Sequence, residues 1–132
     1  MKTKEVLLEQ FTACFDQNDW FVALKNTLTH VTAKQAIWKP ETSDNSIWGI
    51  LSHLNFYNEA YLMRFKGIDY VYPTSDNSET FSISEGPSEA DWESELTRFD
   101  SIMTEWSNLL AIADEIKFDQ PVSKTNDSFW FQ

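Results

Sequence analysis

Histidine is the residue type best suited to proton transfer or metal binding near neutral pH, and this chain of 132 residues contains two, His30 and His53. A catalytic zinc site needs about three protein ligands and one open position. Tyr57 and Arg64 follow His53 at i+4 and i+11, which predicts the same side of a helix. There they could position an anionic or thiol substrate. The alternative is that Tyr57 packs in the core and Arg64 pairs with an acidic neighbour.

The single cysteine, Cys14, allows two interpretations. A reactive thiol is one, and a small core residue is the other. We interpret Cys14 as a core residue because it continues the apolar spacing of the first predicted helix. One cysteine cannot form an internal disulfide, so we expect a reducing, cytoplasmic environment. The chain has no glycine-rich phosphate loop and no G-x-S-x-G nucleophile motif.

The helix that would carry His53 has the clearest start and stop signals in the chain. Ser46 is a typical N-cap residue, and Gly67 suits the left-handed position that ends a helix. His53 falls at the margin of the apolar side between them, roughly 100° around the helix from the centre of that side at about 100° per residue. That side comprises Ile47, Ile50, Leu51, Leu54, Tyr57, Tyr61, Leu62 and Phe65.

Helices are also predicted on both sides of this element. Apolar residues at helical spacing indicate a first helix, with a break or kink near Asn18 and Asp19. The spacing between Thr32 and Gln35 predicts a capping box and a short helix that Pro40 ends. Ser88 starts a long helix whose apolar positions alternate in steps of four and three up to residue 113. Residues 68–87 read as a long loop, a length that often covers a site, and 119–132 as an irregular segment.

Composition limits the fold and the partners. Only 3 glycines and 4 prolines disfavour a many-stranded β fold, so the prediction is one all-α domain over residues 1–132. The net charge of −11 disfavours nucleic acid and anionic membrane surfaces as partners. No run of about 18 apolar residues, the length needed to span a bilayer, is present.

Three segments carry a resemblance to a known family. The stretch SIWGILSHL at 46–54, continuing to RFKG at 64–67, is similar to the second-helix signature of the DinB/YfiT-like family. TAKQAIWKP at 32–40 resembles the segment before that helix in Bacillus-type members, and SEADW at 88–92 fits the start of the third helix. The resemblance implies a four-helix bundle of the up-down type, commonly a homodimer.

The same resemblance implies chemistry. Many family members bind a divalent metal, here zinc or nickel, through three histidines, and His53 matches the first. The other two usually lie in an H-x-x-x-H-x-G-Q motif on the fourth helix, which is absent from this sequence. We therefore expect three long helices with the fourth missing, in either a shortened version of a longer member or a natural variant.

Two functions follow as hypotheses. The first is a metal-dependent enzyme of the thiol (bacillithiol-type) S-transferase or hydrolase kind, with His53 as metal ligand and Tyr57 and Arg64 binding a small thiol or other substrate. The second is a non-catalytic helical module that has lost the metal site and acts through dimerisation or small-ligand binding.

Overall fold

The protein is described by a computed structural model that covers residues 2–120. Every regular element in this range is helical, which confirms the all-α prediction. The elements are α1 (Thr3–Phe15), α2 (Leu24–Leu28), α3 (Ala33–Ile37), α4 (Ile47–Phe65), the 3₁₀ helix η1 (Asn77–Phe81), α5 (Glu89–Ile112) and α6 (Glu115–Asp119).

The predicted helix boundaries rest on local hydrogen bonds that the structure contains. Ser46 accepts from the backbone N–H of Gly49 at 3.0 Å, and Gly67 adopts a φ of 77° after the end of α4. Thr32 and Gln35 form the predicted capping box at the start of α3. Ser88 caps α5 through Asp91 in the same way. Each cap satisfies N–H groups that a helix start leaves without a partner.

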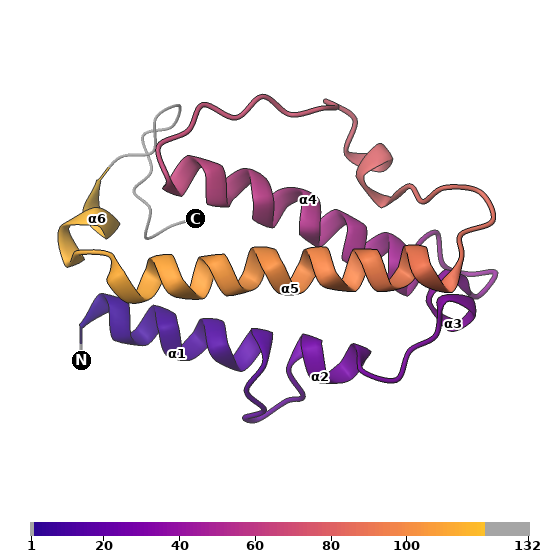
Figure 1. The fold of residues 1–132 in the computed structure, drawn as a ribbon, viewed down its shortest axis with the longest axis horizontal. Coiled ribbons are helices and arrows are strands. Elements are labelled where there is room, and N and C mark those ends of the chain that lie inside the picture. The colour runs from indigo at the N-terminus through magenta and orange to yellow at the C-terminus, as the bar shows by residue number, and fades with distance from the viewer. Residues whose placement is uncertain (1, 121–132) are drawn as a thin grey trace.

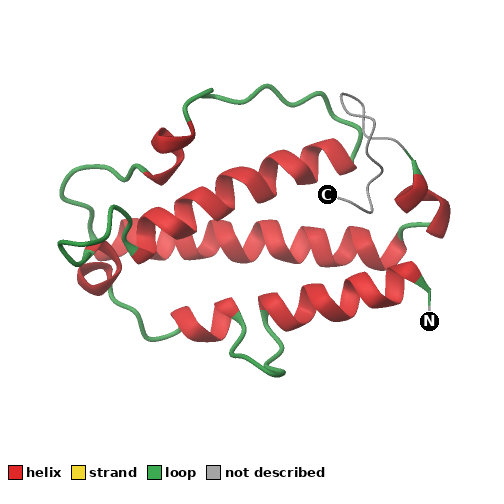
Figure 2. Ribbon diagram, turned by 180° about the vertical axis from the view of Figure 1, so that it is seen from behind, coloured by secondary structure: helices red, strands yellow, loops and turns green. Residues whose placement is uncertain are grey.

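Three long helices, α1, α4 and α5, form the body of the molecule. Figure 1 and the reverse view in Figure 2 show α5 between the other two, with α2 continuing along the α1 side. Among these three helices, α5 packs against both α4 and α1. The longest helix is therefore the shared partner of the other two.

The core divides into two clusters along α5. At the α3 end, the indole of Trp92 is fully buried, packs on Trp48 with ring centroids 5.1 Å apart, and donates to the carbonyl of Val31 at 2.7 Å. At the α6 end, Phe65, Leu110 and Phe118 form the second cluster. Burying one such aromatic side chain contributes roughly 1.5–3 kcal/mol, so both ends of α5 are held mainly by apolar packing.

The 68–87 segment and the region after α5 differ from the predictions. The loop includes η1, a 3₁₀ turn that the sequence pattern did not reveal. In Figure 1 this loop runs along α4 on the side away from α5. The helix α6 was also missed, because five residues are too few for a period to be visible.

The expected four-helix bundle with a missing fourth helix stays a prediction, since residues 121–132 lie outside the described range. None of the described helices is both long and apolar enough to cross a membrane.

Candidate functional site

His53 lies on the side of α4 that faces the loop, and its hydrogen bond determines which ring nitrogen is available. The His53 Nδ1 lies 2.7 Å from the hydroxyl of Thr80, which is itself buried. That hydroxyl donates its only hydrogen to the carbonyl of Asn77 at 2.6 Å. Thr80 must therefore accept from His53, so Nδ1 carries a proton, and in the neutral imidazole Nε2 keeps its lone pair.

Aromatic rings hold the imidazole in place from two directions. The ring of Phe81 stacks on His53 at 4.0 Å with an interplanar angle of 11°. Tyr57 approaches edge-on, with centroids 4.9 Å apart. Because contacts from α4 and from η1 both restrain the ring, the direction of Nε2 is set by the fold.

Tyr57 and Arg64 also bond to the loop. The Tyr57 hydroxyl donates to Asn77 Oδ1 at 3.0 Å. An Arg64 nitrogen donates to the Tyr72 hydroxyl at 2.8 Å, and the guanidinium lies 5.2 Å from the centroid of the Tyr72 ring. Burial raises the pKa of Tyr72, while the Arg64 charge opposes that rise. The three predicted site residues thus share one side of α4 but bond to three different residues of the loop.

Gly49 explains how η1 comes so close to α4. A Cβ added at Gly49 would lie 2.9 Å from the backbone oxygen of Phe81, closer than packed atoms normally approach. The glycine lies four residues before His53, so the same close approach brings Thr80 and Phe81 to the imidazole. The sequence signal was Gly49 itself, a glycine inside an otherwise strong helix pattern.

The described residues do not fit a metal site of their own. Within residues 2–120 no group of three His, Cys, Asp or Glu side chains is placed to hold an ion. His30 is exposed in the turn after α2, and Glu59 pairs with Arg98 of α5 at 2.9 Å. His53 supplies one nitrogen, so its role as a metal ligand stays a prediction.

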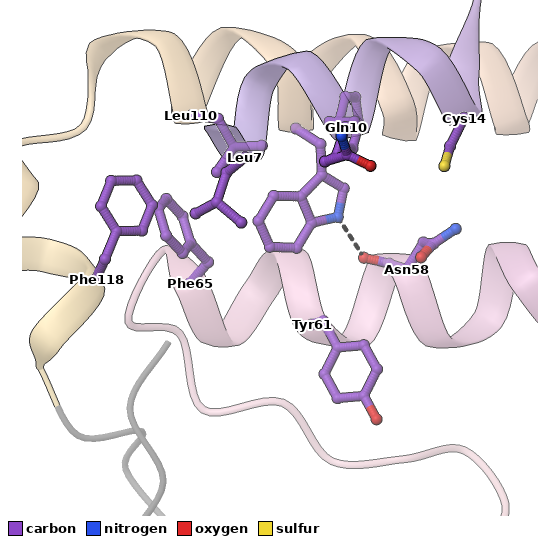
Figure 3. A pocket seen from close by; sticks show the side chains of 10 residues that line it. Leu7, Gln10, Cys14, Asn58, Tyr61, Phe65, Leu110 and Phe118 are labelled. Carbon is purple, nitrogen blue, oxygen red and sulfur yellow. Dashed lines mark hydrogen bonds between the residues drawn. The ribbon is translucent and has the colours of Figure 1, made fainter. Parts of the chain in front are cut away.

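A cavity of about 330 Å³ lies along a neighbouring side of α4, between α1, α4 and α5. Figure 3 shows Leu7, Leu110, Phe65 and Phe118 gathered at one end of it. Sequence analysis did not identify this site, because its wall combines residues of α1 and α5 that are more than 90 positions apart in the chain. The apolar lining residues are Leu7, Phe11, Phe65, Trp106, Leu110 and Phe118.

The polar lining residues are uncharged, and three of them lie together. Gln10, Cys14 and Asn58 occupy the other end of the cavity in Figure 3, whereas the hydroxyl of Tyr61 points away from them. Cys14 is exposed here, so its interpretation as a core residue was wrong. The reason is that α1 packs on α5 from one side only and leaves the Cys14 edge of its apolar stripe open.

Two of these groups have unused hydrogen-bonding capacity. The side-chain amide of Asn58 has only a 3.7 Å contact to the sulfur of Met103, and its Oδ1 makes no hydrogen bond within residues 2–120. The Gln10 amide likewise has no partner in that range. The backbone carbonyl of Asn58 accepts from the Trp106 indole at 2.9 Å (dashed in Figure 3). This bond anchors the backbone of Asn58 while leaving its side chain available.

The fold and the site together define an all-helical protein with a partly enclosed apolar cavity. The family model described as the DinB superfamily matches residues 21–130. The chain therefore belongs to the DinB superfamily, and the resemblance in its sequence motifs is confirmed. Comparison with curated proteins and with solved structures gave no match.

Proposed function

We propose that this DinB-superfamily domain binds a small molecule in the cavity between α1, α4 and α5. The supporting observation is the cavity itself: about 330 Å³, mostly apolar, with uncharged polar groups at one end. Small-molecule sites typically have volumes of about 300–1,000 Å³ and combine an apolar wall with a few polar groups that orient the ligand. This is the binding-module hypothesis, with the cavity as its site.

A pair of matched variants tests the proposal. Gln10→Trp places a large ring at the cavity, and Gln17→Trp places the same ring at another exposed position outside it. Binding of small aromatic probes is followed by the NMR signals of the Trp106 indole and the Asn58 amide. For probes of about ten non-hydrogen atoms we expect dissociation constants of about a millimolar. Gln10→Trp should abolish binding and Gln17→Trp should preserve it. Equal loss, or no binding to the unmodified chain, would contradict the proposal.

A metal-dependent S-transferase or hydrolase is the second candidate. The observation in its favour is the orientation of His53, whose Nδ1 donates to Thr80 and whose Nε2 is left as a possible zinc or nickel ligand. Further ligands would have to come from outside residues 2–120 or from a second copy of the chain. Tyr57 and Arg64 would bind substrate only after their bonds to the loop open.

Metal titration separates this candidate from the first. We expect at most weak zinc or nickel binding by the 132-residue chain, because one imidazole gives little affinity or selectivity. His53→Ala should remove that binding, and His30→Ala serves as the matched control. Equal metal affinity in the two variants would exclude His53 from the site, and tight stoichiometric binding would show that further ligands exist.

Self-association remains a proposal as well. Ile47 and Ile50 on α4 and Trp38 after α3 are exposed by 42%, 47% and 67%, and exposed apolar groups of this size favour a partner surface. The aromatic residues Phe129–Phe131, also predicted to contribute, lie outside the described residues. Sedimentation at about ten micromolar, a typical range for interface affinities, should show a dimer, and a clean monomer would count against it.

A further inference from the structure

The cavity differs at its two ends, and this difference carries information about its ligand. None of the ten lining residues has a charged side chain. The apolar end is formed by Phe65, Leu110 and Phe118, all at most 7% exposed, together with Leu7. The polar end presents the amides of Gln10 and Asn58 beside the Cys14 thiol. A ligand that fills the cavity therefore meets carbon at one end and neutral hydrogen-bonding groups at the other.

This arrangement disfavours the binding of a charged ligand. An ionised group that enters the cavity loses part of its hydration, which costs free energy unless an opposite charge or several hydrogen bonds replace the lost water. None of the lining side chains is itself charged. Two cations lie over rings of the wall, Arg64 over Tyr61 at 5.4 Å and Lys117 over Phe65 at 5.1 Å, and neither ring belongs to the polar end formed by Gln10, Cys14 and Asn58. The net charge of −11 adds a repulsive field for anions in particular. A carboxylate, a phosphate or an acidic thiol is therefore disfavoured.

An uncharged polar group matches the unpaired side chains. The Asn58 amide offers an oxygen with no partner within residues 2–120 and an N–H group held only by a long contact to sulfur. An amide can donate and accept at once, so it suits a carbonyl, a hydroxyl or another amide. We infer that the cavity takes an uncharged amphipathic molecule, with an aromatic or branched aliphatic body against Phe65, Leu110 and Phe118 and a neutral hydrogen-bonding end against Asn58 and Gln10. This inference rests on the proposed function and specifies its ligand class.

Three probes of nearly equal size test the ligand class. 2-Phenylacetamide has the neutral polar end, phenylacetate replaces it with a carboxylate, and ethylbenzene has neither. We expect phenylacetamide to bind the full chain at least about tenfold more tightly than phenylacetate at neutral pH, a factor that corresponds to about 1.4 kcal/mol. Dissociation constants come from the Trp106 and Asn58 signals, which also report that the probe lies in the cavity.

Two variants test which side chains bind the polar group of the probe. Asn58→Leu keeps the side-chain size and removes the amide, so it should weaken phenylacetamide about threefold to tenfold while leaving ethylbenzene unchanged or tighter. Gln10→Leu, at an exposed position that the fold tolerates more easily, should act in the same direction. Thermal unfolding of both variants confirms that they remain folded.

The outcomes distinguish the ligand class from the existence of the site. If phenylacetate binds as well as phenylacetamide, or if the two leucine variants weaken ethylbenzene equally, the ligand class is wrong and the proposed small-molecule site stands. If none of the three probes binds, as when a second copy of the chain fills the cavity, both are overturned.

Discussion

The loop side and the cavity side of α4 both carry polar residues, but these residues differ in whether they have hydrogen-bond partners. On the loop side, His53, Tyr57 and Arg64 each have a hydrogen-bond partner at 3.0 Å or less. On the cavity side, the Asn58 amide has only a 3.7 Å contact to sulfur. A polar group with a good internal partner stabilises the fold, whereas one without a partner at an accessible site can bind a ligand. The contrast favours a structural role for the loop side and ligand binding for the cavity side.

The largest expected effect comes from the apolar end of the cavity. Phe118 is 1% exposed and packs on Phe65 with ring centroids 6.3 Å apart. Phe118→Ala should lower the free energy of unfolding by about 3–5 kcal/mol, through lost burial and an enlarged cavity. Denaturant titration measures the change. Phe21→Ala, at a side chain 54% exposed, is the control and should stay within about 0.5 kcal/mol. Similar losses in both would mean that α6 does not close the cavity.

Gly49→Ala should disrupt the packing of η1 on the loop side of α4 and leave the cavity side intact. Alanine is the better helix former by about 1 kcal/mol, so a gain in stability would be expected from the helix alone. The added methyl would instead meet the Phe81 oxygen at 2.9 Å and push η1 away from α4. We expect a net loss of about 1–3 kcal/mol, the usual cost of overpacking, and a change in the His53 ring signals. Stabilisation with unchanged His53 signals would show that η1 does not pack here.

A pair of adjacent variants compares the two sides directly. Tyr57→Phe removes the hydroxyl that bonds to Asn77 and should cost about 0.5–1.5 kcal/mol of unfolding free energy. Asn58→Leu, on the cavity side, should change stability by less than about 0.5 kcal/mol, because it removes no strong hydrogen bond. Thermal unfolding of the two purified variants under one buffer makes the comparison. The reverse order would invalidate the distinction between the sides.

The smallest expected effect is on the stability of η1 at acidic pH. Hydrogen bonds from the hydroxyl and backbone N–H of Ser78 lower the pKa of Asp76, the N-cap of η1. A carboxyl whose pKa is lower in the folded protein stabilises it above the unfolded pKa of about 4 and loses that contribution as the pH falls through the lowered value. The protection of the η1 amides, relative to their intrinsic exchange rates, should therefore decrease below about pH 4, while probe binding in the uncharged cavity stays constant.

The Asp76→Asn variant is the control for this acid effect. In this variant the protection of the η1 amides, relative to their intrinsic exchange rates, should no longer depend on pH in that range, because asparagine does not titrate. Acid sensitivity that persists in the variant would assign it to another group.

Local patterns in the sequence determined most of the helices. Ser46, Thr32 and Ser88 are caps because their side-chain oxygens bond to N–H groups within three residues, and Gly67 ends α4 because it lacks a Cβ. Such interactions need no distant partner, so spacing alone predicts them. The motifs around His53 also indicated the superfamily, which the family match confirms.

Distant contacts decided the rest. A 3₁₀ turn such as η1 has little stability of its own, and it packs on α4 at Gly49, so its position was not visible in residues 77–81 alone. Which edge of the first apolar stripe is buried depended on how α1 meets α5, and this left Cys14 exposed at the cavity. The sequence by itself thus determined the longer helices, their caps and the side of α4 that carries His53. Only the tertiary structure decided that His53 bonds to Thr80 and that Asn58 and Gln10 share a cavity, because both depend on pairing residues from separate elements.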